Sequence, residues 1–190
     1  MPRLLSPEEY VALEQKLGVK HEYHDGQVFA MEGVSAPHSR LQVTLAAEVQ
    51  TRLRDGSSSA YSSDFRIVVE AANLAVYPDL SVICGPPLRA KAFKHSGTNP
   101  TVLFEVFSPE TESYDRGAKF EQYRKLPTLR EYVLVSQREI AIDLFRLENG
   151  HWVLHPLRGE DAILSLTSAG IEIPLRDIYF DIPFEDAEQA

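Results

Sequence analysis

The sequence predicts a mixed α/β domain, in which helical and strand-like segments alternate along the chain. Helical segments show capping residues or an apolar face that repeats every four residues, whereas the segments between them are short and rich in Val, Ile, Phe and Tyr. The predicted order is helix, strand, strand, strand, helix, strand, with a hairpin in front and further strands behind. We therefore expect a mixed sheet that is covered by helices on at least one face.

The first part of the chain predicts a short helix and a hairpin. Ser6–Glu9 has the spacing of a capping box with a proline at the first helical position, so a helix is expected to begin there and to end near Gly18. The segment His21–Met31 then predicts a hairpin that turns at Asp25-Gly26.

The central part predicts two longer helices around a set of strands. The first helix is expected from Pro37 to about Arg54, and the second from Tyr114 to Leu126, where Pro127 stops it. The apolar face of the first helix consists of Leu41, Leu45, Val49 and Leu53. The expected strands are Tyr61–Glu70, Leu74–Cys84, Thr101–Phe107 and Glu131–Val135, followed by a hairpin of Ile140–Leu147 and Trp152–Leu157 and by short strands and turns.

The composition is that of a globular protein. Of the 190 residues, 44% are hydrophobic and 25% are charged, and no apolar run approaches the roughly 20 residues that cross a bilayer. We therefore expect a single domain over residues 1–190, located in the cytoplasm and without a membrane partner. The single cysteine, Cys84, can form neither an internal disulfide nor, by itself, a zinc site.

The chain is acidic, with 28 Asp and Glu residues against 19 Lys and Arg residues and a net charge of −9. Four of the acids follow Phe180, in a tail over residues 181–190 that we expect to be flexible. The charge argues against a generic nucleic-acid coat, which needs a strongly basic surface, but it allows an enzyme that gathers carboxylates at a metal site. The loop Gly85–Pro100 carries Arg89, Lys91, Lys94 and His95 without an acid, and it either contacts phosphates or is simply solvated.

Two acidic residues interrupt segments that are otherwise apolar. Asp79 follows Tyr77-Pro78, and Glu105 lies within Phe104–Phe107. Burying a carboxylate without a partner is costly, so each needs a compensating interaction. If the two strands are neighbours, the carboxylates meet at one edge of the sheet, where paired hard oxygen ligands suit Mg²⁺. Pro78 lacks an N–H donor, which favours a bulge or a strand end at this point.

The helix expected after residue 114 carries a third candidate. Asp115, Lys119 and Tyr123 are spaced by four residues and share one face, with Gln122 beside them. A pair such as Asp115 and Lys119 is commonly a solvated salt bridge. In the alternative interpretation Lys119 leans toward the acidic residues, where its ammonium group orients an attacking water and balances charge that develops on a phosphate.

As a set, these motifs resemble a known family, the Uma-two-type restriction endonucleases of the PD-(D/E)XK nuclease superfamily. The similar segments are Glu22–Gly26, Pro37–Arg40, Tyr77–Asp79, Phe104–Pro109 and Tyr114–Tyr123, within a resemblance that runs from about Ser6 to Tyr179. The resemblance implies a restriction-endonuclease-like αβββαβ core, with the N-terminal hairpin and the C-terminal strands as additions. It also implies a divalent metal and hydrolysis of phosphodiester bonds in nucleic acid, with DNA as the expected substrate.

The resemblance further implies which residues act. Asp79 and Glu105 would bind Mg²⁺, with Mn²⁺ as a possible substitute, and the carbonyl of Val106 would add a third oxygen. The sequence departs from the superfamily pattern at one position, because the lysine expected two residues after Glu105 is Phe107. Lys119 on the helix is its match, so the expected catalytic residues are Asp79, Glu105 and Lys119.

Five further residues are candidates to support the metal or to contact the substrate, namely Glu22, His38, Asp64, Gln122 and Tyr123. Glu22 and His38 either orient water or metal, or are only a turn-flanking acid and a histidine at a helix start. Asp64 either supports the site from a neighbouring strand or caps a turn.

Three functions stay open at this point. The first is a Mg²⁺-dependent endonuclease, expected as a homodimer because small nucleases often cut two strands with two active sites. The second is a catalytically inactive nuclease-fold module that binds a protein or another ligand. The third is a structural subunit that dimerises through its C-terminal strands, in which Ile140, Ile142, Leu144, Trp152 and Leu154 alternate so that one face is buried.

Overall fold

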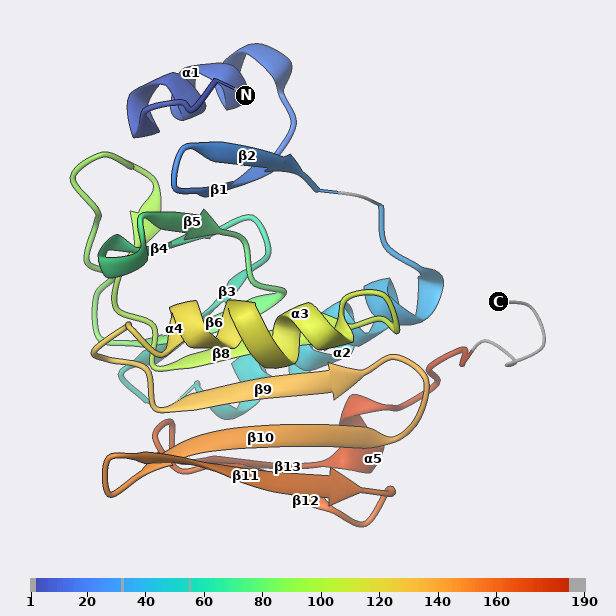
Figure 1. The fold of residues 1–190 in the computed structure, drawn as a ribbon. Coiled ribbons are helices and arrows are strands. Elements are labelled where there is room, and N and C mark those ends of the chain that lie inside the picture. Colours follow the sequence, from blue (N-terminus) through green and yellow to red (C-terminus); the bar gives the residue numbers. More distant parts are fainter. Residues whose placement is uncertain (1–2, 32, 55, 185–190) are drawn as a thin grey trace.

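The computed structural model describes residues 3–31, 33–54 and 56–184, and these form two main sheets with helices around them (Figure 1). The six-stranded sheet consists, in spatial order, of β11 (His151–Arg158), β10 (Ala141–Glu148), β9 (Glu131–Ser136), β8 (Val102–Phe107), β6 (Leu80–Cys84) and β3 (Ser58–Ser62). The five-stranded sheet consists of β2 (Gln27–Ala30), β1 (His21–His24), β5 (Leu74–Val76), β4 (Arg66–Val69) and β7 (Ser96–Gly97). β8 and β9 are parallel and the other pairs in the large sheet are antiparallel, so the predicted mixed sheet is confirmed.

Helices cover both faces of the large sheet, α2 on one side and the α3–α4 segment on the other (Figure 1). The helical elements are α1 (Pro7–Leu17), α2 (Ala36–Arg52), a 3₁₀ turn (Glu70–Ala72), α3 (Glu112–Tyr114), a π-helical turn (Asp115–Lys119), α4 (Phe120–Tyr123) and α5 (Leu175–Ile178). A further hairpin of β12 (Ile163–Leu166) and β13 (Ile171–Pro174) precedes α5. The order α2, β3, β6, β8, helix, β9 is the predicted αβββαβ core.

The alternation of side chains along β8 explains why both faces are covered. Val102, Phe104 and Val106 belong to the core beneath α2, together with the apolar face of that helix. Leu103 faces the opposite side and packs with Phe120 and Tyr123 of the α4 segment. Since successive side chains of a strand point to opposite faces, Glu105 shares the α4 side with Leu103.

The predicted N-terminal elements are confirmed in detail. The Ser6 side chain accepts a hydrogen bond from the Glu9 backbone N–H, and the Glu9 carboxylate accepts one from the Ser6 N–H, which completes the capping box. The hairpin turns at Asp25 and Gly26, both with positive φ, as a tight two-residue turn requires. Ser35 caps α2 by accepting a hydrogen bond from the His38 N–H, which places His38 in the first helical turn.

The prediction of continuous strands over Tyr61–Glu70 and Leu74–Cys84 is wrong, because each segment divides between the two sheets. The first breaks at a turn after Ser62, and the second breaks at Tyr77–Asp79. Pro78 cannot donate a ladder hydrogen bond, so the strand ends there. β4 and β5 therefore belong to the small sheet, where β5 pairs with β1 of the N-terminal hairpin and β4 pairs with β5. Asp79 lies where the chain crosses back to begin β6.

Three further expectations need correction. The helix predicted from Tyr114 begins at Glu112 and contains a π-helical turn, and α5 is a helix where only strands and turns were expected. In the C-terminal hairpin, Ile142 and Leu144 are buried under the α2 side, but the two-residue turn pairs Trp152 with Leu147 and so puts Trp152 on the α4 side, against Phe120. The apolar residues of this hairpin thus lie on two faces, and Ile142 and Leu144 are covered within the chain.

Among the described residues, no helix combines the length and apolar character needed to cross a membrane. Most of the tail expected to be flexible, residues 185–190, lies outside the described residues.

Glu131 is fully buried at the start of β9 and holds the β12–β13 hairpin in place. Its carboxylate accepts hydrogen bonds from the Arg146 Nε (3.0 Å) and from the backbone N–H groups of Thr167 (3.0 Å) and Ser168 (3.2 Å). Glu131→Ala leaves these donors without their acceptor, and we expect the free energy of unfolding to fall by about 3–5 kcal/mol. Urea denaturation measures the loss.

Glu148→Ala is the matched control, because Glu148 pairs with the same Arg146 but its side chain is partly exposed. It should cost less than about 1 kcal/mol. A loss of similar size in both variants would show that the buried position of Glu131 is not the cause.

Candidate active site

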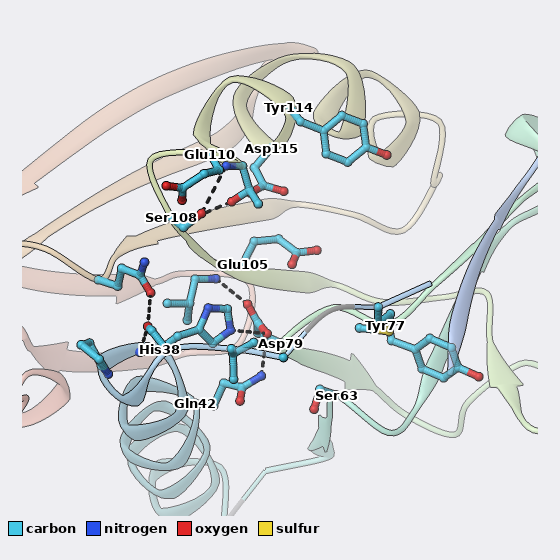
Figure 2. A pocket seen from close by; sticks show the side chains of 18 of the residues that line it. His38, Gln42, Ser63, Tyr77, Asp79, Glu105, Ser108, Glu110, Tyr114 and Asp115 are labelled. Atoms are coloured by element: carbon cyan, nitrogen blue, oxygen red, sulfur yellow. Dashed lines mark hydrogen bonds and ion pairs between the residues drawn. The ribbon is translucent and has the colours of Figure 1, made fainter. Parts of the chain in front are cut away.

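Asp79 and Glu105 lie side by side at one edge of the large sheet, as expected for neighbouring strands (Figure 2). Leu80 of β6 is paired with Phe104 of β8 in an antiparallel ladder, so the residue before Leu80 meets the residue after Phe104. A cavity of about 930 Å³ opens at this edge, and both acids line it. Glu22, His38, Asp115 and Lys119 line the same cavity.

The Asp79 carboxylate is held by donors from two elements. His38 Nε2 lies 3.0 Å from Oδ1, and Gln42 Nε2 donates to the same oxygen at 2.6 Å, both from α2. The Val106 backbone N–H donates to Oδ2 at 2.6 Å. Burial raises the pKa of Asp79, but the hydrogen bond and charge of His38, the Val106 N–H and the charge of Lys119 outweigh it, so the pKa lies below its usual value. Asp79 is therefore an ionised carboxylate with a fixed orientation.

Glu105 and Lys119 form a buried ion pair beside Asp79. The Lys119 Nζ is 2.9 Å from Glu105 Oε1, and the Tyr123 hydroxyl donates to the same oxygen at 2.7 Å. Lys119 Nζ is also 3.5 Å from Asp115 Oδ1 and 3.9 Å from Glu22 Oε1. Three carboxyl groups thus surround one ammonium group, and Asp79 adds a fourth carboxyl group at the same edge.

The π-helical turn Asp115–Lys119 places Lys119 in this cluster. Asp115, Lys119 and Tyr123, which sequence spacing placed on one helical face, are all buried and point toward Glu105 or one another. The Tyr132 hydroxyl donates to the Asp115 carbonyl at 3.1 Å, which ties the turn to β9. π-helical turns are uncommon and occur frequently at functional sites.

The crowding of acids shifts the pKa values of this cluster. Burial raises the pKa of Glu105 to about 8, since the opposing effect of Lys119 is smaller than that of burial together with the charges of Asp79 and Asp115. Burial likewise raises the pKa of Asp115, despite Lys119. Burial lowers the pKa of Lys119, but Glu105, Glu22 and Asp115 more than compensate, so it lies above its ordinary value and the ammonium stays charged. The site therefore holds more carboxyl groups than its one buried lysine can neutralise.

The carboxylate oxygens of this site are suitable ligands for a hard divalent cation. Asp79 and Glu105 present oxygen ligands from adjacent strands, and among the described residues no donor meets Glu105 Oε2. No three His, Cys, Asp or Glu side chains in the described ranges already surround one metal position. The Lys119 ammonium stands among the carboxylates instead, so two protein carboxylates would need further oxygen ligands from backbone or water.

Of the five additional residues that the sequence suggested, three are at the site and two are not. Glu22 lines the cavity, His38 contacts Asp79 and Tyr123 contacts Glu105. Asp64 is instead a largely exposed carboxylate paired with Lys20 at 2.9 Å. Gln122 accepts a hydrogen bond from Lys125 Nζ at 2.6 Å on the exposed side of the helix. The loop with Arg89, Lys91, Lys94 and His95 begins where β6 ends, away from Asp79, and none of these four residues lines the cavity.

Sequence reasoning missed Gln42, although a signal was present. Gln42 follows His38 by four residues and so shares its helical face, which makes both side chains available to the same acceptor. It also missed Lys20, Tyr114 and Arg138, which line the cavity from three separate segments. Their proximity depends on the tertiary fold and leaves no local pattern.

The fold is shared with a known structure. A crystal structure described as a putative nuclease belonging to DUF820, from Anabaena variabilis ATCC 29413, matches 92% of this chain and 97% of its own with a TM-score of 0.72. The two sequences are 14% identical, so the likeness concerns the α/β architecture.

Sequence comparisons identify the family. The model of the Uma2 family, described as "Putative restriction endonuclease", matches residues 7–176, and the chain belongs to this family. Two relatives from Synechocystis sp. (strain ATCC 27184 / PCC 6803 / Kazusa) are also similar. Uncharacterized protein slr1290 is 38% identical over 95% of this chain and 94% of its own length, and uncharacterized protein sll1609 is 29% identical over 84% and 91%. The resemblance read from the motifs is thereby confirmed.

Replacing Glu105 by glutamine is expected to stabilise the metal-free protein at alkaline pH. The pKa of Glu105 is about 8 in the folded chain, above its ordinary value of 4.5. The folded state therefore binds this proton more tightly, and the stability that Glu105 contributes is fully present below pH 4.5 and is lost as the pH rises through 8. Relative to wild type, the free energy of unfolding of Glu105→Gln should rise between about pH 5 and about pH 9, on the order of a few kcal/mol.

Asp79→Asn is the control of opposite sign, measured by urea denaturation in EDTA. The pKa of Asp79 is lowered from 3.8, so its contribution to stability is present above that pH and is lost only as the pH falls. Asp79→Asn should therefore destabilise the protein by an amount that does not change over the same range. If the Glu105→Gln difference stays flat or shrinks with rising pH, the carboxylates do not repel one another as described.

Proposed function

We propose that this protein is a divalent-metal-dependent endonuclease that hydrolyses phosphodiester bonds of DNA. The observation that carries the proposal is the 2.9 Å contact between Lys119 Nζ and Glu105 beside Asp79. Phe107 stands where the superfamily pattern has a lysine, so a nuclease of this type needs an ammonium group from another element. Lys119 supplies one from the helix, in the same cavity as both acids.

Asp79, Glu105 and the Val106 carbonyl are the proposed ligands of Mg²⁺, with Mn²⁺ as a substitute. The Val106 N–H is directed at Asp79, and the N–H and C=O of one strand residue point to the same side, so the carbonyl faces the same edge. The ladder between β6 and β8 ends at Leu80 and Phe104, which leaves that carbonyl beyond the paired region. A bound Mg²⁺ supplies Lewis-acid polarisation of the phosphate and lowers the pKa of a coordinated water.

The residues of the chain have separate tasks in this proposal. Asp79 is kept ionised and oriented by His38, Gln42 and the Val106 N–H, which preorganises a ligand. Lys119 remains protonated, so it positions the attacking water and stabilises negative charge on the phosphate oxygens. Tyr123 and Glu22 hold Glu105 and Lys119 in place.

The second candidate is a catalytically inactive module of the same fold that binds a protein or ligand, and the acidic net charge of −9 favours it. A homodimer stays a prediction. Ile142 and Leu144 are already covered within the chain, so a second copy is not needed to bury them. The single domain over residues 1–190 and the cytoplasmic location are likewise proposals.

Removal of the Asp79 carboxylate or of the Lys119 ammonium group should abolish metal-dependent cleavage of DNA. Asp79→Ala removes a metal ligand and Lys119→Ala removes the ammonium group that stabilises the phosphate, and we expect each to lower the cleavage rate by at least about 10²-fold. The assay uses plasmid, single-stranded and branched DNA with Mg²⁺ or Mn²⁺. Equal cleavage by wild type and both variants would identify a contaminating nuclease and refute the assignment.

Asp64→Ala and Gln122→Ala are controls for this assay, because Asp64 and Gln122 are polar residues that do not line the cavity. Both should retain cleavage within about threefold of wild type, as expected for surface substitutions.

Metal binding separates the enzyme from the inactive module. Titration calorimetry with Mn²⁺ should give a binding heat for wild type that disappears in Asp79→Ala and persists in Asp64→Ala. Absence of any Mn²⁺ heat in correctly folded wild type would favour the module.

A further inference from the structure

We propose that the substrate enters this site as an unpaired strand, a single strand, frayed end or flap, with one base stacked on Tyr114 at the rim of the cavity. This inference rests on the proposed nuclease function and names its substrate class. It is carried by the depth of the acidic residues, by the apolar rim above them, and by the charge of the cavity.

The reactive groups lie at the floor of the cavity. The side chains of Asp79, Glu105 and Lys119 are only 12%, 6% and 9% exposed. Met31 and Val34 also line the cavity, as do Ser108 and Tyr114. Figure 2 shows Ser108, Glu110 and Tyr114 on the far side of Glu105 from Asp79. Duplex DNA is stiff over its persistence length, so bending it to follow the floor of a cavity costs free energy. An unpaired strand is flexible and can lower one phosphate to this floor without that cost.

The rim carries exposed apolar side chains. Val19 and Val34 are 52% and 53% exposed, and Tyr114 is 45% exposed, and all three line the cavity. Tyr114 lies directly before Asp115, at the point where α3 passes into the π-helical turn, and Figure 2 shows it above the floor formed by Glu105 and Asp79. Apolar and aromatic surfaces match the faces of unpaired bases and do not match phosphates, and stacking on an aromatic side chain is worth about 1–3 kcal/mol per base.

Two polar residues shortly before this tyrosine hold the turn that precedes α3. The Ser108 N–H donates to Thr111 Oγ1 at 3.1 Å, and the Thr111 N–H donates to Ser108 Oγ at 3.3 Å. These reciprocal hydrogen bonds close the turn that leads into α3. The backbone that leads to Tyr114 is therefore held by side-chain hydrogen bonds, and the Tyr114 side chain itself is half exposed.

The charge of the cavity opposes a duplex as well. Its lining carries the carboxylates of Glu22, Asp79, Glu105, Glu110 and Asp115 against the cations Lys20, Lys119 and Arg138. Lys20 and Lys119 are already engaged with Asp64 and Glu105. Binding of a duplex depends on many phosphate contacts with Lys and Arg, which this surface does not offer. Stacking of a base together with one phosphate at the metal requires far fewer cations.

The test compares substrates of one sequence, namely a single strand, a blunt duplex and a duplex with a single-stranded flap, in Mn²⁺. Wild type should cleave the single strand and the flap at least about tenfold faster than the duplex, and flap cuts should fall in the unpaired arm. This comparison of substrates uses the wild-type protein alone. Duplex cleavage as fast as single-strand cleavage would overturn the inference but leave the nuclease intact, whereas no metal-dependent cleavage of any substrate would refute the proposed function.

Variants of residue 114 test the stacking. Tyr114→Phe should behave as wild type, and Tyr114→Leu should raise KM for the single strand by about tenfold with little change in kcat. Phe180→Leu is the control, because Phe180 is a 71% exposed aromatic that does not line the cavity. In Ca²⁺, wild type and Tyr114→Phe should quench the fluorescence of an oligonucleotide that contains 2-aminopurine, whereas Tyr114→Leu should not. Equal KM values and equal quenching in all variants would show that no base stacks there.

Discussion

The ion pair between Glu105 and Lys119 is the contact around which the edge of the large sheet is organised. A carboxylate in the middle of an apolar strand is costly unless a partner reaches it, and Lys119 does so at 2.9 Å. The partner is shared, because Asp115 and Glu22 lie within 3.9 Å of the same ammonium. One lysine cannot neutralise this group of acids, which is why burial and mutual repulsion raise the pKa of Glu105 while Lys119 stays charged. Such an arrangement is poor for stability and suits the binding of a cation.

The break at Tyr77–Asp79 makes this arrangement possible. Because Pro78 ends β5, the chain crosses from the small sheet to the large one at the residue that carries the second acid. Asp79 is therefore a strand-end residue with free space on one side, and α2 can reach it with two side chains.

Local sequence patterns were sufficient for most of the fold and for the central residues of the site. The capping box at Ser6, the four-residue period in α2 and the turn at Asp25-Gly26 are short-range features whose physics is complete within one element. The pairing of Asp79 with Glu105 also followed from two acids in apolar strands. The predictions that failed depend on contacts between segments that are distant in sequence. Nothing local tells that β4 and β5 belong to another sheet, that Trp152 faces α4, or that Lys20 and Arg138 reach the same cavity.

Asp64 and Gln122 show the limit of spacing arguments, and their positions bear on how the site works. Both are polar residues close in sequence to true members of the cavity, yet Asp64 pairs with Lys20 at the outside and Gln122 faces solvent with Lys125. Lys20 is thereby held at the cavity by an acid that does not itself enter it. The floor keeps its excess of carboxylates while the rim keeps a neutralised cation, so the field inside the cavity is negative and favours a divalent cation over a phosphate. Under the proposed nuclease function, a bound cation would also reduce the repulsion between this cavity and the phosphates of a nucleic acid.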